Sequence, residues 1–545
     1  MKFKRALVLV SSDPESIRKG ADEVYRGFEQ ELQACGLTEE VALNRLRGSE
    51  RSDALPLVVI YPEALVYGPV TLADVRRIVA EQLQGGRVLE DLLADRSEYS
   101  GRLGWLKARK GSLPAEKRVV LRRAGLIDPE NIEDYLNTEG YQGLAKALGM
   151  APMEVIETLE DSGLQGRGGA GFPTGKKWRF VASAKSEQRY VVCNADESEP
   201  GTFKDRAILE GDPQAVIEAM IIAGYAAGAS EGYIYVRGEY PLAQKRLLRA
   251  IQQAKKYAYL GRNILNSGFD FEIHVHSGAG AYVCGEETAL LESIEGRRGE
   301  PRARPPYPTT HGLWGKPTLI NNVETLANVP PILLNGAEWY QGLGVPNSPG
   351  TKVYSILGNV NLKGLIEVPM GITLREVINI YGQGMLEGEN FKLAQTGGSS
   401  GSIIPDSLQD TPMDFESFRK AGVSLGSGAL LICDERTCVL DLAVTLMNFF
   451  RFESCGKCTP CRVGTERAFR ILSAISQGHG HLGDLETLEN LASEMEIASN
   501  CGLGQSATAP IRDSLKYFRA EVEAHIRLGV CPSGVCEMNP EQVSA

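Results

Sequence analysis

Short apolar runs alternate with amphipathic stretches over the first 85 residues. RALVLV (5–10) and PLVVIYP (56–62) are compact apolar runs of the kind found in buried strands. GADEVYRGFEQELQACG (20–36) and TLADVRRIVAEQLQGG (71–86) follow them, and both have helical periodicity. This order of strand, helix, strand and helix predicts a small α/β unit at the start of the chain.

The pattern changes three times further along. RYVVCNA, GYIYVRG and FDFEIHVHSG predict strands between helical stretches in a glycine-rich region, and TKVYSILGNVNLKGLIEVP opens a β-rich segment. The last part, from CVLDLAVTLMNFFRF onward, has the periodicity of packed helices. We therefore predict a multidomain α/β chain with these boundaries: 1–95, an α/β unit; 96–155, linker and helices; 156–345, the cofactor-binding domain; 346–432, a small β-rich domain; 433–545, a helical bundle.

Bulk properties exclude several classes of protein. A chain of 545 residues with 43% hydrophobic and 23% charged residues is an ordinary globular protein of several domains. The formal net charge of −11 argues against nucleic acid as the main partner. No apolar run is long enough to span a membrane, and the N-terminus lacks the pattern of a signal peptide. We expect a cytoplasmic protein.

Eight of the eleven cysteines lie between residues 433 and 536. ESCGKCTPCRVG (453–464) places Cys455, Cys458 and Cys461 at the spacing C-x2-C-x2-C. Three thiolates so close can converge on one zinc ion or one iron–sulfur cube, and either requires a fourth ligand. Cysteine-rich chains without an export signal favour metal or redox chemistry over disulfides.

The glycine-rich stretch GLQGRGGAGFPTGKKW (163–178) contains Gly166, Gly168 and Gly171 in the pattern G-x-G-x-x-G. A Rossmann site requires a strand before this pattern, whereas the preceding APMEVIETLEDSG looks helical. The glycines still allow the backbone to approach a ligand and to offer N–H groups to phosphate. The alternative is an ordinary glycine-rich loop.

Acidic side chains follow a predicted strand and a glycine turn in the same region. CNADESEPGTFKDR (193–206) and GAGAYVCGEETALLESIEG (278–296) contain them. One interpretation is that these carboxylates only cap helices. The other is that they bind a ligand, because open α/β folds bind ligands at the ends of strands. Carboxylates accept hydrogen bonds from ribose hydroxyls and carboxamides, and asparagine can pair with a flavin edge.

Five stretches together resemble the NADH-binding flavoprotein subunit of complex I and the related diaphorase subunits of hydrogenases and formate dehydrogenases. They are GRGGAGFPTGKKW, CNADESEPGTFKDR, YVCGEETALLESIEG, GKPTLINNVETLANVP and ESCGKCTPCRVG, and the likeness covers roughly residues 130–540. It implies FMN, a [4Fe-4S] cluster and an NAD(H) site. The implied layout is a thioredoxin-like domain, a Rossmann-like FMN/NADH domain, a ubiquitin-like β-grasp domain and a helical bundle carrying the cluster.

The resemblance also supplies the fourth cluster ligand. The family has it about forty residues after the triplet, where SNCGLGQSATAP provides Cys501. With a flavin in the same chain, a [4Fe-4S] cluster held by Cys455, Cys458, Cys461 and Cys501 is a better interpretation than zinc.

Roles for individual residues follow from the same resemblance. The loop that should surround FMN and the dinucleotide comprises Gly166, Arg167, Gly168, Gly169, Ala170, Gly171 and Lys177. The flavin ring should be held by Asn194, Asp196 and Glu197, in a pocket lined by Tyr282, Gly285 and Glu286. The ribityl phosphate should meet Asn321, Asn322 and Thr325.

The resemblance places the dinucleotide on further residues. Phe172, Phe180 and Tyr307 should stack on the adenine, although each could instead be packed in the core. Glu199 and Glu287 should bind the nicotinamide ribose and carboxamide. No side chain is needed as a general base, because the reaction is a hydride exchange between NAD(H) and FMN followed by one-electron transfer to the cluster.

The implied function is an NADH dehydrogenase or diaphorase subunit in a multisubunit hydrogenase or similar complex, with electron bifurcation to ferredoxin as one mode that the resemblance implies. The alternative is the diaphorase subunit of a formate dehydrogenase or of complex I. The implied partners are iron–sulfur subunits: a [2Fe-2S] thioredoxin-like subunit, a multi-cluster subunit and a catalytic hydrogenase or dehydrogenase subunit. The chain ends at GVCEMNPEQVSA, so clusters facing ferredoxin would lie on partners.

The N-terminal unit resembles the thioredoxin-like [2Fe-2S] domain of some relatives, but Ser11 and Ser16 stand where two cysteines are expected. RGSERSDAL, where the second pair should fall, has no cysteine. We predict a scaffold without a cluster.

NAD is the expected nucleotide, because acids that receive the adenosine ribose repel a 2′-phosphate. RRGEPRARPPYP (297–308) nevertheless places four arginines near Tyr307, where they could bind pyrophosphate, favour NADP or lie in solvent.

A second metal site is expected near the C-terminus. EAHIRLGVCPSGVCE offers His525, Cys531 and Cys536, and Cys438 would complete a tetrahedron for a structural zinc ion. A similar segment in the bifurcating relatives supports this prediction. The alternatives are free buried thiols, or a core Cys438 beside three residues that bind nothing.

Overall fold

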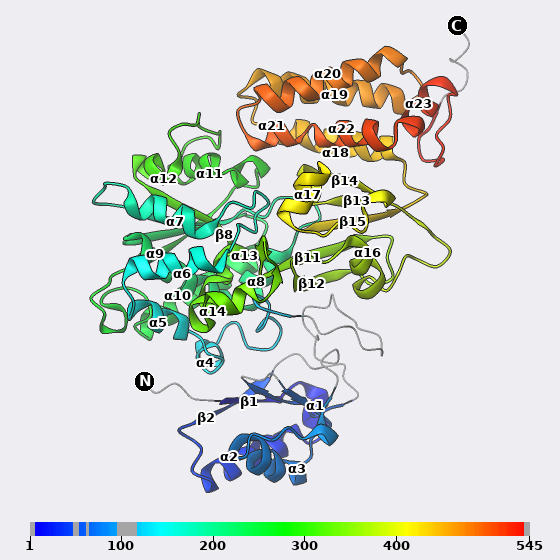
Figure 1. Cartoon of the computed structure of the whole chain (residues 1–545). Coiled ribbons are helices and arrows are strands. Elements are labelled where there is room, and N and C mark those ends of the chain that lie inside the picture. The colour runs from blue at the N-terminus through cyan, green and yellow to red at the C-terminus, as the bar shows by residue number, and fades with distance from the viewer. Residues whose placement is uncertain (1–5, 47–53, 62–64, 95–116, 539–545) are drawn as a thin grey trace.

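The computed structural model describes residues 6–46, 54–61, 65–94 and 117–538, which form four units (Figure 1). We refer to them as the N-terminal unit (6–94), the parallel-sheet unit (117–341), the mixed-sheet unit (344–434) and the helical unit (438–538). None of the helices in these ranges is long and apolar enough to cross a membrane. The first part, 96–116, of the segment predicted as linker and helices (96–155) lies outside the described residues, and so does most of the stretch RGSERSDAL.

The N-terminal unit is a four-stranded sheet with the strand order β2-β1-β3-β4, in which β1 and β2 are parallel. Every residue of β1 is buried, as its apolar sequence predicts, and α2 covers the sheet with Val24, Phe28 and Leu32. The elements are β1 (Ala6–Ser11), α1 (Pro14–Arg18), α2 (Ala21–Ala34), β2 (Val41–Leu46), β3 (Val58–Tyr61), β4 (Leu65–Tyr67) and α3 (Leu72–Arg77), whose last turn continues as η1 (Ile78–Gln84).

The parallel-sheet unit is built on four parallel strands in the order β7-β6-β5-β8. They are β5 (Tyr190–Ala195), β6 (Glu231–Val236), β7 (Glu272–Ser277) and β8 (Thr318–Asn322). Three of these are the strands predicted above. Since all four run the same way, their carboxyl ends share one edge, and Asn194 lies directly beside Asn322 there.

Helices cover this sheet on both faces. Almost every residue of α9 is buried, because its sequence AVIEAMIIAGYAA has no polar face. The helices are α4 (Ile132–Leu136), α5 (Gln142–Leu148), α6 (Pro152–Ser162), α7 (Thr174–Ser183), α8 (Lys204–Gly211), α9 (Pro213–Ala227), α10 (Pro241–Lys256), α11 (Glu287–Ile294), α12 (Pro308–His311), α13 (Val323–Ala327), α14 (Val329–Asn335) and α15 (Ala337–Gln341).

The mixed-sheet unit lies between the parallel-sheet unit and the helical unit (Figure 1). Its five-stranded sheet has the order β12-β11-β15-β13-β14, with β11 and β15 parallel. The elements are β9 (Gly344–Val345), β10 (Ser348–Pro349), β11 (Thr351–Gly358), β12 (Gly364–Pro369), α16 (Leu374–Glu376), η7 (Val377–Tyr381), β13 (Phe391–Thr396), β14 (Ile403–Pro405), α17 (Phe415–Ala421) and β15 (Ala429–Asp434).

The described part of the helical unit contains six helices, where the sequence predicted a bundle of unstated number. They are α18 (Val439–Glu453), α19 (Thr459–Ser476), α20 (Leu482–Ala498), α21 (Gly502–Ser506), α22 (Ala509–Tyr517) and α23 (Arg519–Arg527). They bury an apolar core that includes Leu440, Met447, Leu472 and Leu488.

Candidate functional site

The glycine-rich loop connects α6 to α7 and does not follow a strand, in agreement with the helical pattern before it. Gly169 and Gly171 have φ angles of 120° and 65°, which favour glycine. A Cβ on Gly171 would come within 2.6 Å of the ring of Phe415 in the mixed-sheet unit. Gly168 and Ala170 are exposed. The loop is therefore held in a tight conformation and presents its middle to solvent.

The side chain of Arg167 anchors this loop to the interior of the protein. Its guanidinium is fully buried and donates to the carbonyl oxygens of Thr351 (3.0 Å) and Pro349 (2.8 Å) and to the hydroxyl of Tyr340 (3.2 Å). Its backbone N–H donates to Thr325 Oγ1 at 2.8 Å. The side chain of Arg167 therefore anchors the loop and points away from the surface where a cofactor would lie.

Asn194 and Asp196 extend from the carboxyl end of β5. Asn194 Nδ2 donates to the carbonyl oxygen of Gly285 at 2.8 Å, which joins this strand to the glycine turn before α11. Asp196 Oδ1 accepts from Ser198 at 3.1 Å, while the buried Oδ2 has no hydrogen-bond partner among the described residues. Burial raises the pKa of Asp196 to about 7. An unsatisfied buried carboxylate oxygen needs a partner, and a bound ligand can provide one.

Glu197 lies beside Asp196 but serves a different purpose. Its carboxylate accepts from the backbone N–H groups of Asp205 (2.8 Å) and Arg206 (2.9 Å) at the start of α8, and from Tyr240 (3.2 Å). Burial raises its pKa to about 8. The side chain thus behaves as a helix cap, which is the alternative considered for these acids.

Glu199 is joined to two other parts of the chain. It accepts from the hydroxyl of Tyr282 (2.7 Å) and from the backbone N–H (2.9 Å) and hydroxyl (2.8 Å) of Ser400. Ser400 ends the short turn η8 (Gly398–Ser400) of the mixed-sheet unit. Burial raises the pKa of Glu199. The mixed-sheet unit therefore takes part in this pocket.

Glu286 and Glu287 open α11 on the other side of the pocket. Glu286 Oε2 caps the helix, while its buried Oε1 has no hydrogen bond within the described ranges and is ion-paired with Arg304 at 3.4 Å. Glu287 is paired with Lys177 at 2.9 Å and with Arg304 at 3.1 Å. Burial opposes ionisation of Glu287, but these two cations hold its pKa below the usual value.

The three aromatic residues assigned to the adenine are all exposed: Phe172 by 44%, Phe180 by 46% and Tyr307 by 55%. Their exposure argues against the alternative that they are core residues. Lys176 lies 6.0 Å from the ring centroid of Phe180. Apolar rings exposed beside a charged pocket are available for stacking.

Asn321, Asn322 and Thr325 lie at the end of β8 and the start of α13. Asn321 Oδ1 accepts from the indole of Trp178 at 2.9 Å. Asn322 caps α13 and donates to Asp205 at 2.7 Å. A Cβ on Gly168 would lie 3.2 Å from Asn322 Cβ, so the glycine-rich loop crosses directly over this residue.

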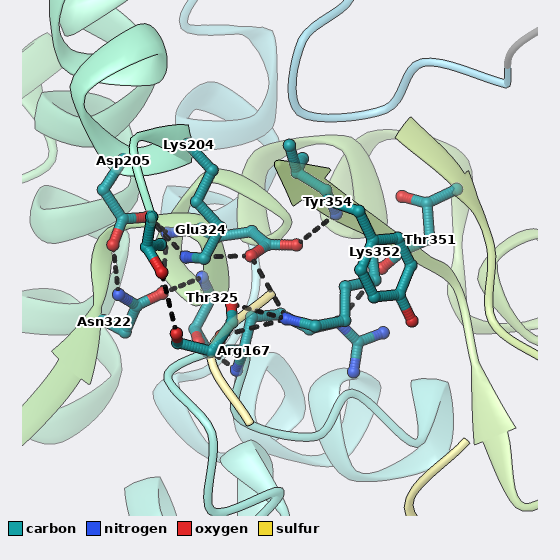
Figure 2. A network of polar contacts seen from close by, with 12 residues as sticks. Arg167, Lys204, Asp205, Asn322, Glu324, Thr325, Thr351, Lys352 and Tyr354 are labelled. Carbon is teal, nitrogen blue, oxygen red and sulfur yellow. Dashed lines mark hydrogen bonds and ion pairs between the residues drawn. The ribbon is translucent and has the colours of Figure 1, made fainter. Parts of the chain in front are cut away.

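A network of buried charges lies beneath the loop (Figure 2). Lys204 contacts Asp205 at 2.7 Å and Glu324 at 2.9 Å. Lys352, from β11 of the mixed-sheet unit, lies 3.8 Å from Glu324. The network connects α8, α13 and the mixed-sheet unit at one point under the loop.

The four predicted cluster cysteines converge at one end of the helical unit. Cys458 caps α19, Cys461 lies in its first turn, and Cys501 caps α21. Burial raises the pKa of Cys461 to about 11, and the charges of Cys455, Cys458 and Cys501 act in the same direction. Four thiols around one point are the ligand set of a [4Fe-4S] cluster.

Several contacts join the cluster loop to the pocket. The backbone N–H of Tyr282 donates to Glu453 at 3.0 Å, and its ring lies 5.0 Å from that of Phe449. Arg298 donates to the carbonyl oxygen of Cys455 at 2.9 Å, and Lys457 donates to that of Pro301 at 2.8 Å. The pocket and the cysteines are therefore neighbours.

The second cysteine group is also assembled. The ligand atoms of Cys438, His525, Cys531 and Cys536 lie within 4.8 Å of one another. Cys438 Sγ is 3.5 Å from His525 Nε2 and 3.6 Å from Cys536 Sγ. His525 Nδ1 lies 2.8 Å from the carbonyl oxygen of Glu521, which leaves Nε2 to bind a metal. The structure therefore brings together the four residues that the sequence proposed as ligands.

Comparison with known proteins agrees with this geometry. The profile of the Nuo51 FMN-binding domain matches residues 159–331, and that of the NADH-ubiquinone oxidoreductase-F iron-sulfur binding region matches residues 441–525. The HndC subunit of the NADP-reducing hydrogenase of Solidesulfovibrio fructosivorans is 50% identical over 77% of this chain and 85% of its own length. The F 2 subunit of the NADH-quinone oxidoreductase of Rhizobium meliloti is 48% identical over 76% of this chain and 99% of its own.

A solved structure extends the likeness to nearly the whole chain. A chain of the NAD+-reducing [NiFe]-hydrogenase in its H2-reduced state has a TM-score of 0.67 and 31% identity, covering 96% of this chain and 85% of that one. The overall class is therefore a mixed α/β multidomain oxidoreductase subunit. The chain belongs to the family of NADH-binding flavoprotein subunits that carry FMN and a [4Fe-4S] cluster in complexes of the hydrogenase or complex I type.

The predicted family, FMN and [4Fe-4S] cluster are confirmed. The comparisons do not support zinc over an iron–sulfur cluster at the second cysteine group. Sequence reasoning missed two contributions of the mixed-sheet unit, Ser400 and Lys352. The glycines of TGGSSGS (396–402) were a sequence signal that could have indicated Ser400. The single lysine in the apolar strand TKVYSIL was a weaker signal for Lys352.

Proposed function

We propose that this chain is the NAD(H)-reacting subunit of a multisubunit complex, with FMN in the pocket at the carboxyl edge of the parallel sheet. The observation that carries the proposal is the buried carboxylate oxygen Asp196 Oδ2, which has no hydrogen-bond partner among the described residues. Nearby, Glu286 Oε1 has no hydrogen bond there either and is only ion-paired with Arg304 at 3.4 Å. FMN, when bound, supplies the exchange between hydride and single electrons that the cluster requires.

The residues of the chain then have these roles. Asn194, Asp196 and Glu286 offer polar groups to the flavin ring, and the glycine-rich loop with Asn321, Asn322 and Thr325 receives the phosphate. Glu199 and Glu287 bind the nicotinamide half, while the exposed rings of Phe172, Phe180 and Tyr307 take the adenine. Tyr282 links the pocket to the cluster loop through Glu453. Binding, orientation and exclusion of water are the tasks of the protein.

We propose NAD(H) as the nucleotide, although one relative is named NADP-reducing. The arginines of the 297–304 loop are occupied within the chain: Arg297 and Arg302 pair with Glu292 and Glu295. Arg304 pairs with Glu287. A 2′-phosphate would have to displace one of these ion pairs. A kinetic comparison of NADH with NADPH tests this, and a clear preference for NADPH would contradict it.

The domain layout is part of the proposal. The strand orders of three units support a thioredoxin-like N-terminal domain, a Rossmann-like cofactor domain and a β-grasp domain, and the helices of the fourth unit support a cluster-bearing bundle. Ser11 accepts from the N–H of Leu57 at 2.9 Å and Ser16 donates to Asp13 at 2.5 Å, which supports a cluster-free N-terminal scaffold. Iron and sulfide analysis tests this, since a binuclear signal would contradict it.

The proposed partners are iron–sulfur subunits, including a [2Fe-2S] thioredoxin-like subunit, a multi-cluster subunit and a catalytic hydrogenase or dehydrogenase subunit. The names of the relatives, which are subunits of such enzymes, support this. None of the eleven cysteines, all within the described residues, forms a disulfide bond, which supports a reducing compartment such as the cytoplasm. An NAD reduction assay of the complex with and without ferredoxin distinguishes electron bifurcation from simple diaphorase activity.

For the second cysteine group we propose a single structural zinc ion. Zinc bonds of about 2.3 Å in a tetrahedron place neighbouring sulfur atoms roughly 3.8 Å apart, close to the 3.6 Å between Cys438 and Cys536. Thiolates bound to different irons of a cube lie further apart. Zinc analysis of the purified chain tests this: iron above the content of one cube, without zinc, would favour an iron–sulfur cluster.

The central test is spectroscopic. Purified chain should contain flavin and a cluster, and NADH should bleach the flavin. Asp196→Ala and Glu286→Ala should lower flavin content, whereas Glu239→Ala, which changes an exposed acid paired with Arg237, should not. Unchanged flavin content in both pocket variants would contradict the proposed placement.

A further inference from the structure

The glycine-rich loop rests on a lysine that belongs to the mixed-sheet unit. Lys352 is the second residue of β11 and its side chain is fully buried. Its Nζ contacts the carbonyl oxygen of Arg167 at 3.3 Å (Figure 2). It also contacts the carbonyl oxygen of Ser427 at 3.0 Å. A buried ammonium group is costly unless charges and acceptors surround it, so this position requires a physical reason.

The balance of buried charges around Lys352 favours an anion nearby. Three buried cations occupy the network, namely Arg167, Lys204 and Lys352, against two buried carboxylates, Asp205 and Glu324. Burial raises the pKa of the adjacent Glu197 to about 8, which reduces the negative charge that it contributes. The buried cations beneath the loop thus outnumber the two carboxylates that pair with them directly, and an anionic ligand on the loop can balance the excess positive charge.

The contact with the carbonyl oxygen of Arg167 directs the effect of the Lys352 charge to one peptide bond of the glycine-rich loop. Lys352 donates to the carbonyl of the peptide bond whose N–H belongs to Gly168, the exposed residue that crosses over Asn322. A cation at the oxygen of a peptide polarises it and makes its N–H a stronger donor. The lysine therefore fixes the loop and also favours an anion above Gly168.

We propose that Lys352 is a positioning residue for the flavin phosphate, acting through the peptide bond between Arg167 and Gly168. This inference rests on the proposed placement of the phosphate at Asn321, Asn322 and Thr325. A phosphomonoester gains from the polarised N–H and from the buried charge, whereas the flavin ring does not. Lys352 therefore contributes to the selection of FMN over riboflavin.

The experiment compares two flavins on the full chain after its flavin has been removed. Lys352→Met should weaken FMN binding about tenfold or more and leave riboflavin binding within about twofold. Lys352→Gln keeps a donor without the charge and should give a smaller loss of the same kind. Lys363→Met is the matched control, because Lys363 is an exposed lysine of the same unit, and it should change neither affinity.

The pH dependence provides a second readout. Burial lowers the pKa of Lys352 to about 8, so its charge is present below that pH and is lost above it. The ratio of FMN to riboflavin affinity should fall between about pH 7 and pH 9 in the wild type, and less in Lys352→Gln. Glu197 ionises in the same range and acts in the same direction, so the difference between the two curves isolates Lys352. The charged groups that face Lys352 are Glu324, Lys204, Arg167 and Asp205.

Two results would overturn the inference. Equal losses of FMN and riboflavin affinity in both variants would mean that Lys352 only supports packing, and unchanged affinities would mean that it has no role. A wild type that binds FMN and riboflavin equally would instead refute the phosphate placement itself.

Discussion

The two cysteine groups of the helical unit differ in how closely their ligand atoms approach. At the C-terminal group, Cys438 Sγ lies 3.5 Å from His525 Nε2 and 3.6 Å from Cys536 Sγ. The Cys455 group is also convergent, but among the described residues only the Cys438 group has its ligand atoms within 4.8 Å. A single ion needs the closer arrangement and a cube needs the wider one. The short distances in the Cys438 group thus support the proposal of a single ion there, whereas the family match supports the cube at the Cys455 group.

Their surroundings differ as well. The Cys455 group lies next to the pocket, through Tyr282, Glu453 and Arg298. The Cys438 group joins the start of α18 to the end of α23 and the segment after it. The first position suits electron transfer and the second suits a structural link between distant parts of the chain.

Loss of a cluster ligand should have the largest effect. Cys461→Ser should abolish the [4Fe-4S] signal and electron transfer beyond the flavin, because a buried cluster ligand has no substitute nearby. Zinc content should stay the same. Cys433→Ser, a buried cysteine outside both groups, should keep both metals. If Cys461→Ser lost both metals, the two cysteine groups would not be independent metal sites.

Loss of a ligand at the other group should act on stability. Cys531→Ser should remove zinc and lower the midpoint of thermal unfolding by roughly 5 °C or more, while the iron content and flavin reduction by NADH stay close to wild type. Calorimetry and metal analysis check this. If zinc were unchanged in this variant, the proposed site would be wrong.

Zinc binding at the Cys438 group should depend on pH. In the metal-free chain burial raises the pKa of Cys438 to about 11, while backbone N–H groups hold that of Cys531 near 6 in spite of burial. Binding of zinc at neutral pH must therefore release the proton of Cys438. Affinity should rise about tenfold per pH unit for each proton released, and competition with a chelator measures it. A pH-independent affinity would argue against this ligand.

A smaller effect should follow from the lysine between the cluster cysteines. Lys457→Met removes a cation that donates to Pro301 beside the cluster loop. The reduced cluster carries more negative charge, so its midpoint potential should fall by an amount on the order of tens of millivolts. Lys457→Arg should recover most of the shift in a redox titration. An unchanged potential in Lys457→Met would show that the lysine only supports the loop.

The sequence predicted much of this molecule because its signals are local. The strands of the parallel sheet are compact apolar runs, and the cluster triplet lies within seven residues. The roles of Glu197 and Arg167 were harder to predict, since a side chain facing a helix start or a buried anchor looks the same in sequence as one facing a ligand. Lys352 and Ser400 reach the pocket only through the packing of one unit on another.

The most direct test of the account is an anaerobic titration of the purified chain with NADH, followed by electron paramagnetic resonance. In the wild type, NADH should bleach the flavin and produce the signal of one reduced [4Fe-4S] cluster. In Cys461→Ser, NADH should bleach the flavin without that signal. A wild-type chain whose flavin is reduced while no cluster signal appears at any NADH concentration would contradict the account.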